Sequence, residues 1–208
     1  MLKKAAFAAF FVSIRYIHDI NQRHSVVTMA LKATILKATL SLSDIDRHLY
    51  KDYSLTLARH PSETDERLMM RILAYAMNAD DQLTFGKGIS NDEEAALWKK
   101  NYSNDIECWI EVGLPAEERL RKACSQAQHV ICYAYGVERN VDIWWKKIAD
   151  KLQRFEHLQV IQLPSHATLA LTTLAQTAMN LQCTINEGNI WLSDNTNNIA
   201  IAPVTLKG

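Results

Sequence analysis

The stretch Asp105-Ile-Glu-Cys-Trp-Ile-Glu-Val-Gly113 alternates apolar and polar residues, as a half-buried β-strand does. A regular strand places one set of side chains on a single face. The apolar set is Ile106, Cys108, Ile110 and Val112. The opposite set is Asp105, Glu107, Trp109 and Glu111. Three carboxylates on one face suit a divalent metal site, and they are equally typical of a solvent-exposed sheet face.

Strand geometry limits which of these carboxylates could share a metal ion. Residues two apart lie about 6.7 Å apart, so Asp105 and Glu107 could converge, whereas Glu107 and Glu111, roughly 13 Å apart, could not easily do so. Glu107 is therefore the central candidate ligand. Further carboxylates are expected from the preceding acidic run or from a helix N-terminus. They are Asp92, Glu93 or Glu94 in the run, and Glu63 or Glu66 at the helix.

The same residues have plain structural interpretations. Glutamates in a first helical turn complement the helix dipole, and Glu63 could pair with Arg67 four residues on. Trp109 could stack on a base, but packing in the core is favoured for a tryptophan at such a position. These alternatives stay open at the level of the sequence.

Composition excludes few function classes. The 208 residues carry 23 Lys and Arg against 23 Asp and Glu, so no net charge recruits nucleic acid or an anionic membrane, although local basic patches remain available. The four cysteines form no Cys-x-x-Cys pair and the histidines no helical pair, which disfavours the common zinc and thioredoxin-like sites. The cysteines are typical of buried thiols in a reducing compartment, so a cytoplasmic location is predicted.

The first 28 residues are predicted to be an extension, either unstructured or the result of a start codon placed too early. Lys3-Lys4 and the apolar run that follows resemble a signal peptide, but the run is short, charged residues follow at once, and no small-x-small cleavage site appears. A membrane span is not expected.

From residue 29 onward the pattern predicts one α/β domain, with no internal repeat or low-complexity linker. Ser62 is expected to cap the first helix, and Pro115 and Pro164 to open two others, while residues 142–155 form a fourth. The expected strands cover 31–40, 49–57, 83–85, 105–113, 129–135, 158–163, 181–185 and 189–192. The first two and the last two are expected to form hairpins, the last turning at Asn186-Glu187-Gly188.

From Met29 to about Pro203 the chain resembles the YaeQ family. The resemblance rests on five blocks: Ser54-Leu-Thr-Leu-Ala-Arg-His-Pro-Ser-Glu-Thr-Asp-Glu-Arg67, Phe85-Gly-Lys-Gly88 with the acidic run to Trp98, Ile106-Glu-Cys-Trp-Ile-Glu-Val-Gly113, Arg121-Lys-Ala123 and Leu181-Gln-Cys-Thr-Ile185. It implies a PD-(D/E)XK restriction-endonuclease-like core of one helix, three antiparallel strands, a second helix and a fourth strand, to which the N-terminal and C-terminal β-hairpins are added.

The resemblance also implies a site. Glu107 would be the acid of the (D/E)-x-K element, with Glu63, Asp92 and Glu94 as further ligands of Mg²⁺ or Mn²⁺. Trp109 stands where the lysine belongs, so Lys122 or Arg121 on the next helix would have to replace it, with Glu111 as a further candidate catalytic residue. Ala95 and Ala96 occupy positions where relatives carry proline and an acid, which weakens the second ligand position.

Two functions follow from this resemblance. One is a Mg²⁺-dependent phosphodiesterase that acts on nucleic acid. The other is a non-catalytic module that keeps the nuclease scaffold and binds nucleic acid or a protein partner, because a fold alone does not determine a function.

Overall fold

The computed structural model describes residues 33–86 and 94–208, and Lys32–Gly208 forms one compact unit. The predicted extension, 1–28, lies outside the described residues. The described elements, in chain order, are β1 (Thr34–Asp44), β2 (Leu49–Arg59), α2 (Asp65–Met77), β3 (Leu83–Phe85), β4 (Leu97–Lys100), β5 (Ile106–Val112), α3 (Glu117–Gln126), β6 (Ala127–Ala134), α4 (Glu138–Leu152), β7 (Leu158–Gln162), α5 (Ser165–Leu171), a 3₁₀ turn η1 (Thr172–Leu174), β8 (Ala178–Asn186), β9 (Asn189–Ser193), β10 (Asn198–Ile201) and β11 (Val204–Lys207).

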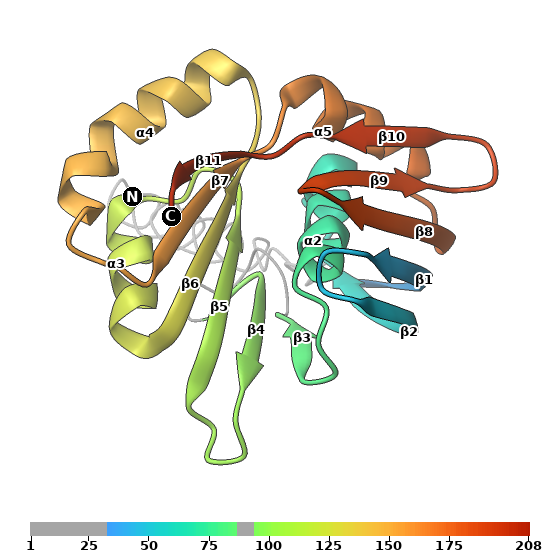
Figure 1. Cartoon of the computed structure of the whole chain (residues 1–208), viewed down its shortest axis with the longest axis horizontal. Helices are drawn as coiled ribbons and strands as arrows, with labels where there is room; N and C mark the ends of the chain where they lie inside the picture. Colours follow the sequence, from blue (N-terminus) through green and yellow to red (C-terminus); the bar gives the residue numbers. More distant parts are fainter. Residues whose placement is uncertain (1–32, 87–93) are drawn as a thin grey trace, which may run out of the picture. The chain divides into compact units, whose positions relative to one another are not determined.

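The strands form two sheets (Figure 1). The first has the order β10-β9-β8-β1-β2, and the second has the order β11-β7-β6-β5-β4-β3. In the second sheet β3, β4 and β5 pair antiparallel, whereas β6 runs parallel to both β5 and β7. The fold is therefore a mixed α/β fold, as the sequence predicts.

Helix α2 lies between the two sheets and is buried on all sides from Leu68 to Ala76. Its residues share one core with the inner faces of both sheets, including Leu40 of β1 and Ile110 of β5. A helix with no solvent-facing side must be covered by more than one partner. The two sheets and α5 provide this cover, since their buried residues belong to the same core cluster as those of α2.

The start of α2 corrects the sequence prediction. Thr64, rather than Ser62, is the N-cap, and its hydroxyl accepts a hydrogen bond from the Arg67 N–H at 3.2 Å. Asp65 and Glu66 occupy the first turn, but Glu63 precedes the helix and is buried. The shift of two residues moves Glu63 from the expected first turn of the helix to a buried position before it.

The two predicted hairpins belong to a single sheet. β1 pairs antiparallel with β2 and parallel with β8, which joins the N-terminal and C-terminal strands. The turn between β8 and β9 consists of Glu187 and Gly188, both with positive φ, as the two-residue hairpin turn requires. Local sequence patterns predict each hairpin. They do not predict the parallel pairing of β1 with β8, because it joins residues far apart in sequence.

Strand β5 departs from strict alternation at its beginning. Cys108, Ile110 and Val112 face the core around α2, and Trp109 faces the opposite side, but Ile106 packs on the same side as Trp109. The pairing with β4 shifts register between Lys99 and Lys100, and such an irregularity rotates the side chains that follow it. The acidic face expected from the sequence is therefore interrupted.

Helices α3 and α4 cover the other face of the second sheet. Leu120, Ala123, Ile148 and Leu152 pack there against β-strand residues such as Val130. No helix in the described part of the chain is long and apolar enough to span a membrane.

Truncation of α2 tests its central place in the core. Leu73→Ala should lower the free energy of unfolding by about 2–5 kcal/mol, because Leu73 is fully buried and the helix cannot collapse toward one side to fill the cavity. Leu169→Ala in α5 is the matched control, since Leu169 is 58% exposed and the change should stay within about 0.5 kcal/mol. Urea denaturation measures both, and equal effects would contradict the proposed core.

Candidate functional site

Glu111 is a buried carboxylate near the end of β5, with 2% of its surface exposed. Its Oε1 accepts hydrogen bonds from the Trp109 indole N–H at 2.6 Å and from Arg119 Nε at 2.9 Å. Nη2 of Arg119 lies 2.8 Å from the same oxygen and donates to the Glu94 carbonyl at 2.7 Å. A buried carboxylate requires such compensation, and here Arg119 ties β5, α3 and the residue at 94 together.

Trp109 is a core residue. It is 1% exposed, and its ring meets that of Trp98 edge-to-face at 5.9 Å between centroids. Lys100 lies above the Trp98 ring, with Nζ 3.7 Å from the centroid. The favoured interpretation of Trp109 is thus confirmed. The position two residues after Glu107 holds a buried ring and no ammonium group.

Glu107 lies at the beginning of β5, where it pairs with Lys99 at 3.4 Å. Lys99 also donates to Asp80 at 2.8 Å, a hydrogen bond that raises the pKa of Lys99 and lowers that of Asp80. The pair borders a cavity of about 650 Å³. Its lining includes Lys99, Glu107, Cys108, His129, Glu156 and His157. Glu107 and Glu111 are four positions apart along β5, so these two carboxylates do not form one site.

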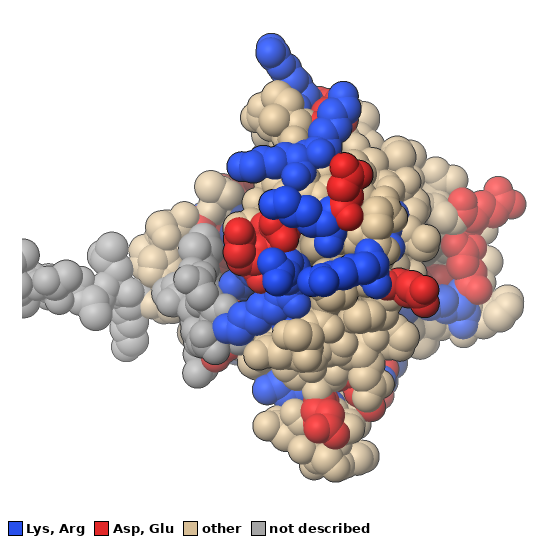
Figure 2. All heavy atoms as spheres, turned by 90° about the vertical axis from the view of Figure 1, so that its left-hand side faces the viewer, with Lys and Arg blue, Asp and Glu red and all other residues tan. Residues whose placement is uncertain are grey.

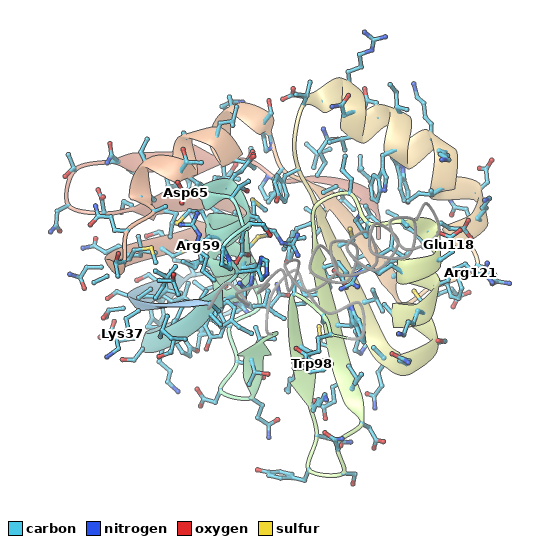
Figure 3. All side chains as sticks on the ribbon, turned by 180° about the vertical axis from the view of Figure 1, so that it is seen from behind. Lys37, Arg59, Asp65, Trp98, Glu118 and Arg121 are labelled. Atoms are coloured by element: carbon cyan, nitrogen blue, oxygen red, sulfur yellow. The ribbon has the colours of Figure 1, made fainter. Side chains whose placement is uncertain are left out.

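Glu63 forms a third, separate ion pair. Both of its carboxylate oxygens lie 3.1 Å from the guanidinium of Arg71, which is fully buried, and Arg67 lies 3.8 Å away. Burial lowers the pKa of Arg71, and the negative charge of Glu63 opposes that effect. Arg59 donates to the Glu63 carbonyl and pairs with Asp65 at 2.7 Å; the two labelled side chains lie together in Figure 3.

The remaining predicted residues lie elsewhere. Arg121 is exposed on α3 and lies 3.4 Å from Glu117, and it borders a cavity with Lys122 near α4. Glu66 is bound by the Thr168 hydroxyl at 2.7 Å. Asp92 lies outside the described residues. Arg119 is the residue that sequence reasoning missed, and the only signal for it is that a buried Glu111 would require a cation.

The described acids do not form a metal centre. Within residues 33–86 and 94–208, no three His, Cys, Asp or Glu side chains are grouped so that they could hold a metal ion. Arginine or lysine instead occupies the position next to Glu63, Glu107 and Glu111, where a cation would have to bind. With Asp92 outside the described residues, the predicted Mg²⁺ or Mn²⁺ site stays a prediction.

Comparison with known proteins gives consistent matches. A family described as "YaeQ protein" matches residues 29–203. The "Uncharacterized protein YaeQ" of Escherichia coli (strain K12) is 46% identical over 173 residues, which are 83% of this chain and 95% of that protein; the protein of that name from Salmonella typhi matches to the same extent. The crystal structure of YaeQ protein from Xanthomonas axonopodis pv. citri has a TM-score of 0.81 at 43% identity, covering 85% of this chain and 99% of that one. YaeQ protein from Pseudomonas syringae has a TM-score of 0.80 at 32% identity, covering 85% and 97%.

Loss of Arg119 should destabilise the protein. Arg119→Met leaves the Glu111 carboxylate buried without its cation, so the free energy of unfolding should fall by about 3 kcal/mol. Adding Glu111→Gln to this variant should restore most of the loss, because an amide needs no counter-charge. Arg121→Met on the same helix is the control: its pair with Glu117 is half exposed and is worth under about 1 kcal/mol. Equal losses in Arg119→Met and Arg121→Met, by urea denaturation, would argue against a buried pair.

The thiol of Cys108 should react slowly. Burial raises its pKa to about 11, while the thiol still lines the cavity beside Lys99. The rate of alkylation by iodoacetamide should therefore rise about tenfold per pH unit from about pH 8 to about pH 10, because only the thiolate reacts. Mass spectrometry of the Cys108 peptide measures the rate. A plateau in the native protein below about pH 10 would contradict the shift, and the urea-unfolded chain supplies the unshifted reference.

Proposed function

Since this chain belongs to the YaeQ family, we propose that it is a non-catalytic nucleic-acid-binding module built on a PD-(D/E)XK nuclease-like core. The order α2, β3, β4, β5, α3, β6 supports the core, because it repeats the helix, three antiparallel strands, helix and strand of that scaffold. The scaffold supplies the surface on which the nucleic acid binds.

One observation supports the non-catalytic part of this proposal. Three candidate acids of the expected site are each bound by a cation: the expected ligands Glu63 and Glu107 by Arg71 and Lys99, and the catalytic candidate Glu111 by Arg119. A divalent ion would have to displace a guanidinium or ammonium group from each acid, at three separate places. Two of these carboxylates are buried, so displacement would also leave a guanidinium group without its partner.

A Mg²⁺-dependent phosphodiesterase is the second candidate. It is favoured by Arg119, which brings the carboxylate of Glu111 and the backbone of Glu94 together at one end of β5. In that function Glu111, rather than Glu107, would be the central acid, and Arg119 would replace the missing lysine more directly than Lys122 or Arg121. The same experiment separates the two candidates.

Calorimetric titration of the full chain with Mg²⁺ and with Mn²⁺ is the test. The proposed module should give no saturable heat at millimolar ion, and labelled single-stranded DNA and RNA should remain full length in either metal. Glu111→Gln and Glu107→Gln are the matched variants. Saturable binding that Glu111→Gln abolishes and Glu107→Gln retains, together with metal-dependent shortening of a labelled strand, would establish the phosphodiesterase and overturn the module.

A further inference from the structure

Helices α3 and α4 form a groove with a basic lining. Two adjoining cavities, of about 460 and 520 Å³, share Glu118, Arg121 and Arg154 in their walls. The other lining residues are Glu117, Lys122, Ser125, Lys151 and Phe155. We call this feature the α3–α4 groove. Figure 2 views the face formed by these helices and shows Lys and Arg side chains gathered across it.

The charge of this face differs from that of the whole chain. Residues 117–156 carry eight Lys and Arg against six Asp and Glu, although the full chain is balanced at 23 each. The lining holds two acids, Glu117 and Glu118, against four cations. Glu117 is already paired: Lys151 donates to it at 2.7 Å, which lowers the pKa of that carboxyl, and Arg121 lies 3.4 Å from it. The groove therefore presents a net positive lining to a ligand.

An aromatic ring lies among these cations. Phe155 borders the same cavity as Arg121, and the Arg154 guanidinium lies 4.7 Å from its ring centroid. Guanidinium groups bind phosphate oxygens in a bidentate manner, and an aromatic face accepts a stacked base of any sequence. An acidic peptide would use the cations but offers no base to the ring. The combination fits a single nucleic-acid strand.

We infer that the α3–α4 groove binds the sugar–phosphate backbone of single-stranded nucleic acid, with Arg121 and Arg154 on phosphates and Phe155 against a base. This inference rests on the proposed function and gives it a location. Arg119 fixes α3 to β5 from the inner side, so the groove is held by the same helix that completes the buried Glu111 pair.

Fluorescence anisotropy of the full chain with labelled oligo-dT or oligo-U of about 20 nucleotides, in EDTA, tests the groove. Arg121→Glu with Arg154→Glu should weaken binding about tenfold or more and lower the slope of log K against log salt by about 1.4, or about 0.7 for each lost phosphate contact. Phe155→Leu should weaken binding and leave that slope unchanged. A comparison of the two oligonucleotides separates RNA from DNA as the source of the strand.

The matched control is the double variant Lys37→Glu with Lys51→Glu. Both lysines are exposed and lie on β1 and β2 of the first sheet. In Figure 3 the labelled Lys37 and Arg121 lie on opposite sides. The control should bind like the wild type. Equal loss of affinity in both double variants would contradict binding in the groove but not the proposed function. The same conclusion would follow if polyglutamate displaced the labelled oligonucleotide as well as an unlabelled oligonucleotide of the same charge does. No binding by the wild type would overturn both. Arg121→Gln with Arg154→Gln, checked by circular dichroism, repeats the test if charge reversal disturbs folding.

Discussion

The buried guanidinium of Arg71 is the interaction on which the two-sheet arrangement depends. It has no exposed surface, so the protein must supply both its counter-charge and its hydrogen-bond acceptors. Glu63 supplies the charge, and the carbonyls of Ala58, at the end of β2, and of Gly86, after β3, supply further acceptors. β2 belongs to one sheet and β3 to the other. One side chain of α2 thus fixes both sheets to the helix between them.

The same physical rule explains how α3 is anchored to the second sheet. Glu111 is buried on the far side of β5, and its cation comes from α3. Glu63 and Glu111, which are candidates for the expected metal-dependent site, instead form ion pairs that join neighbouring secondary-structure elements. Removing either partner would leave a charge in the interior, which is why such pairs persist even where apolar residues would pack as well. This fold can therefore retain buried acids for structural reasons.

Patterns along the chain identified most elements because hydrophobic periodicity is a local property. The hairpin at Glu187-Gly188 and the core position of Trp109 are confirmed for that reason. The parallel pairing of β1 with β8 and the cation partners of Glu63 and Glu111 were not predictable in the same way, since they join residues distant in sequence. The register shift at Lys99 and Lys100 also has no local sequence signal, and it interrupts the expected acidic face.

Helix α3 connects the interior with the basic face. Its inner side carries Leu120, Ala123 and Arg119, which fix the helix to the sheet, while Arg121 lines the α3–α4 groove. A helix held by a buried ion pair loses little further freedom when a ligand binds to its outer side, so less of the binding free energy is spent on ordering it. Because the chain has no net charge, the proposed attraction of a polyanion would depend on a local arrangement of cations such as this one and would be directional. In the proposed complex, the buried Arg119–Glu111 pair would therefore contribute to binding by positioning the groove, even though it lies outside the groove lining.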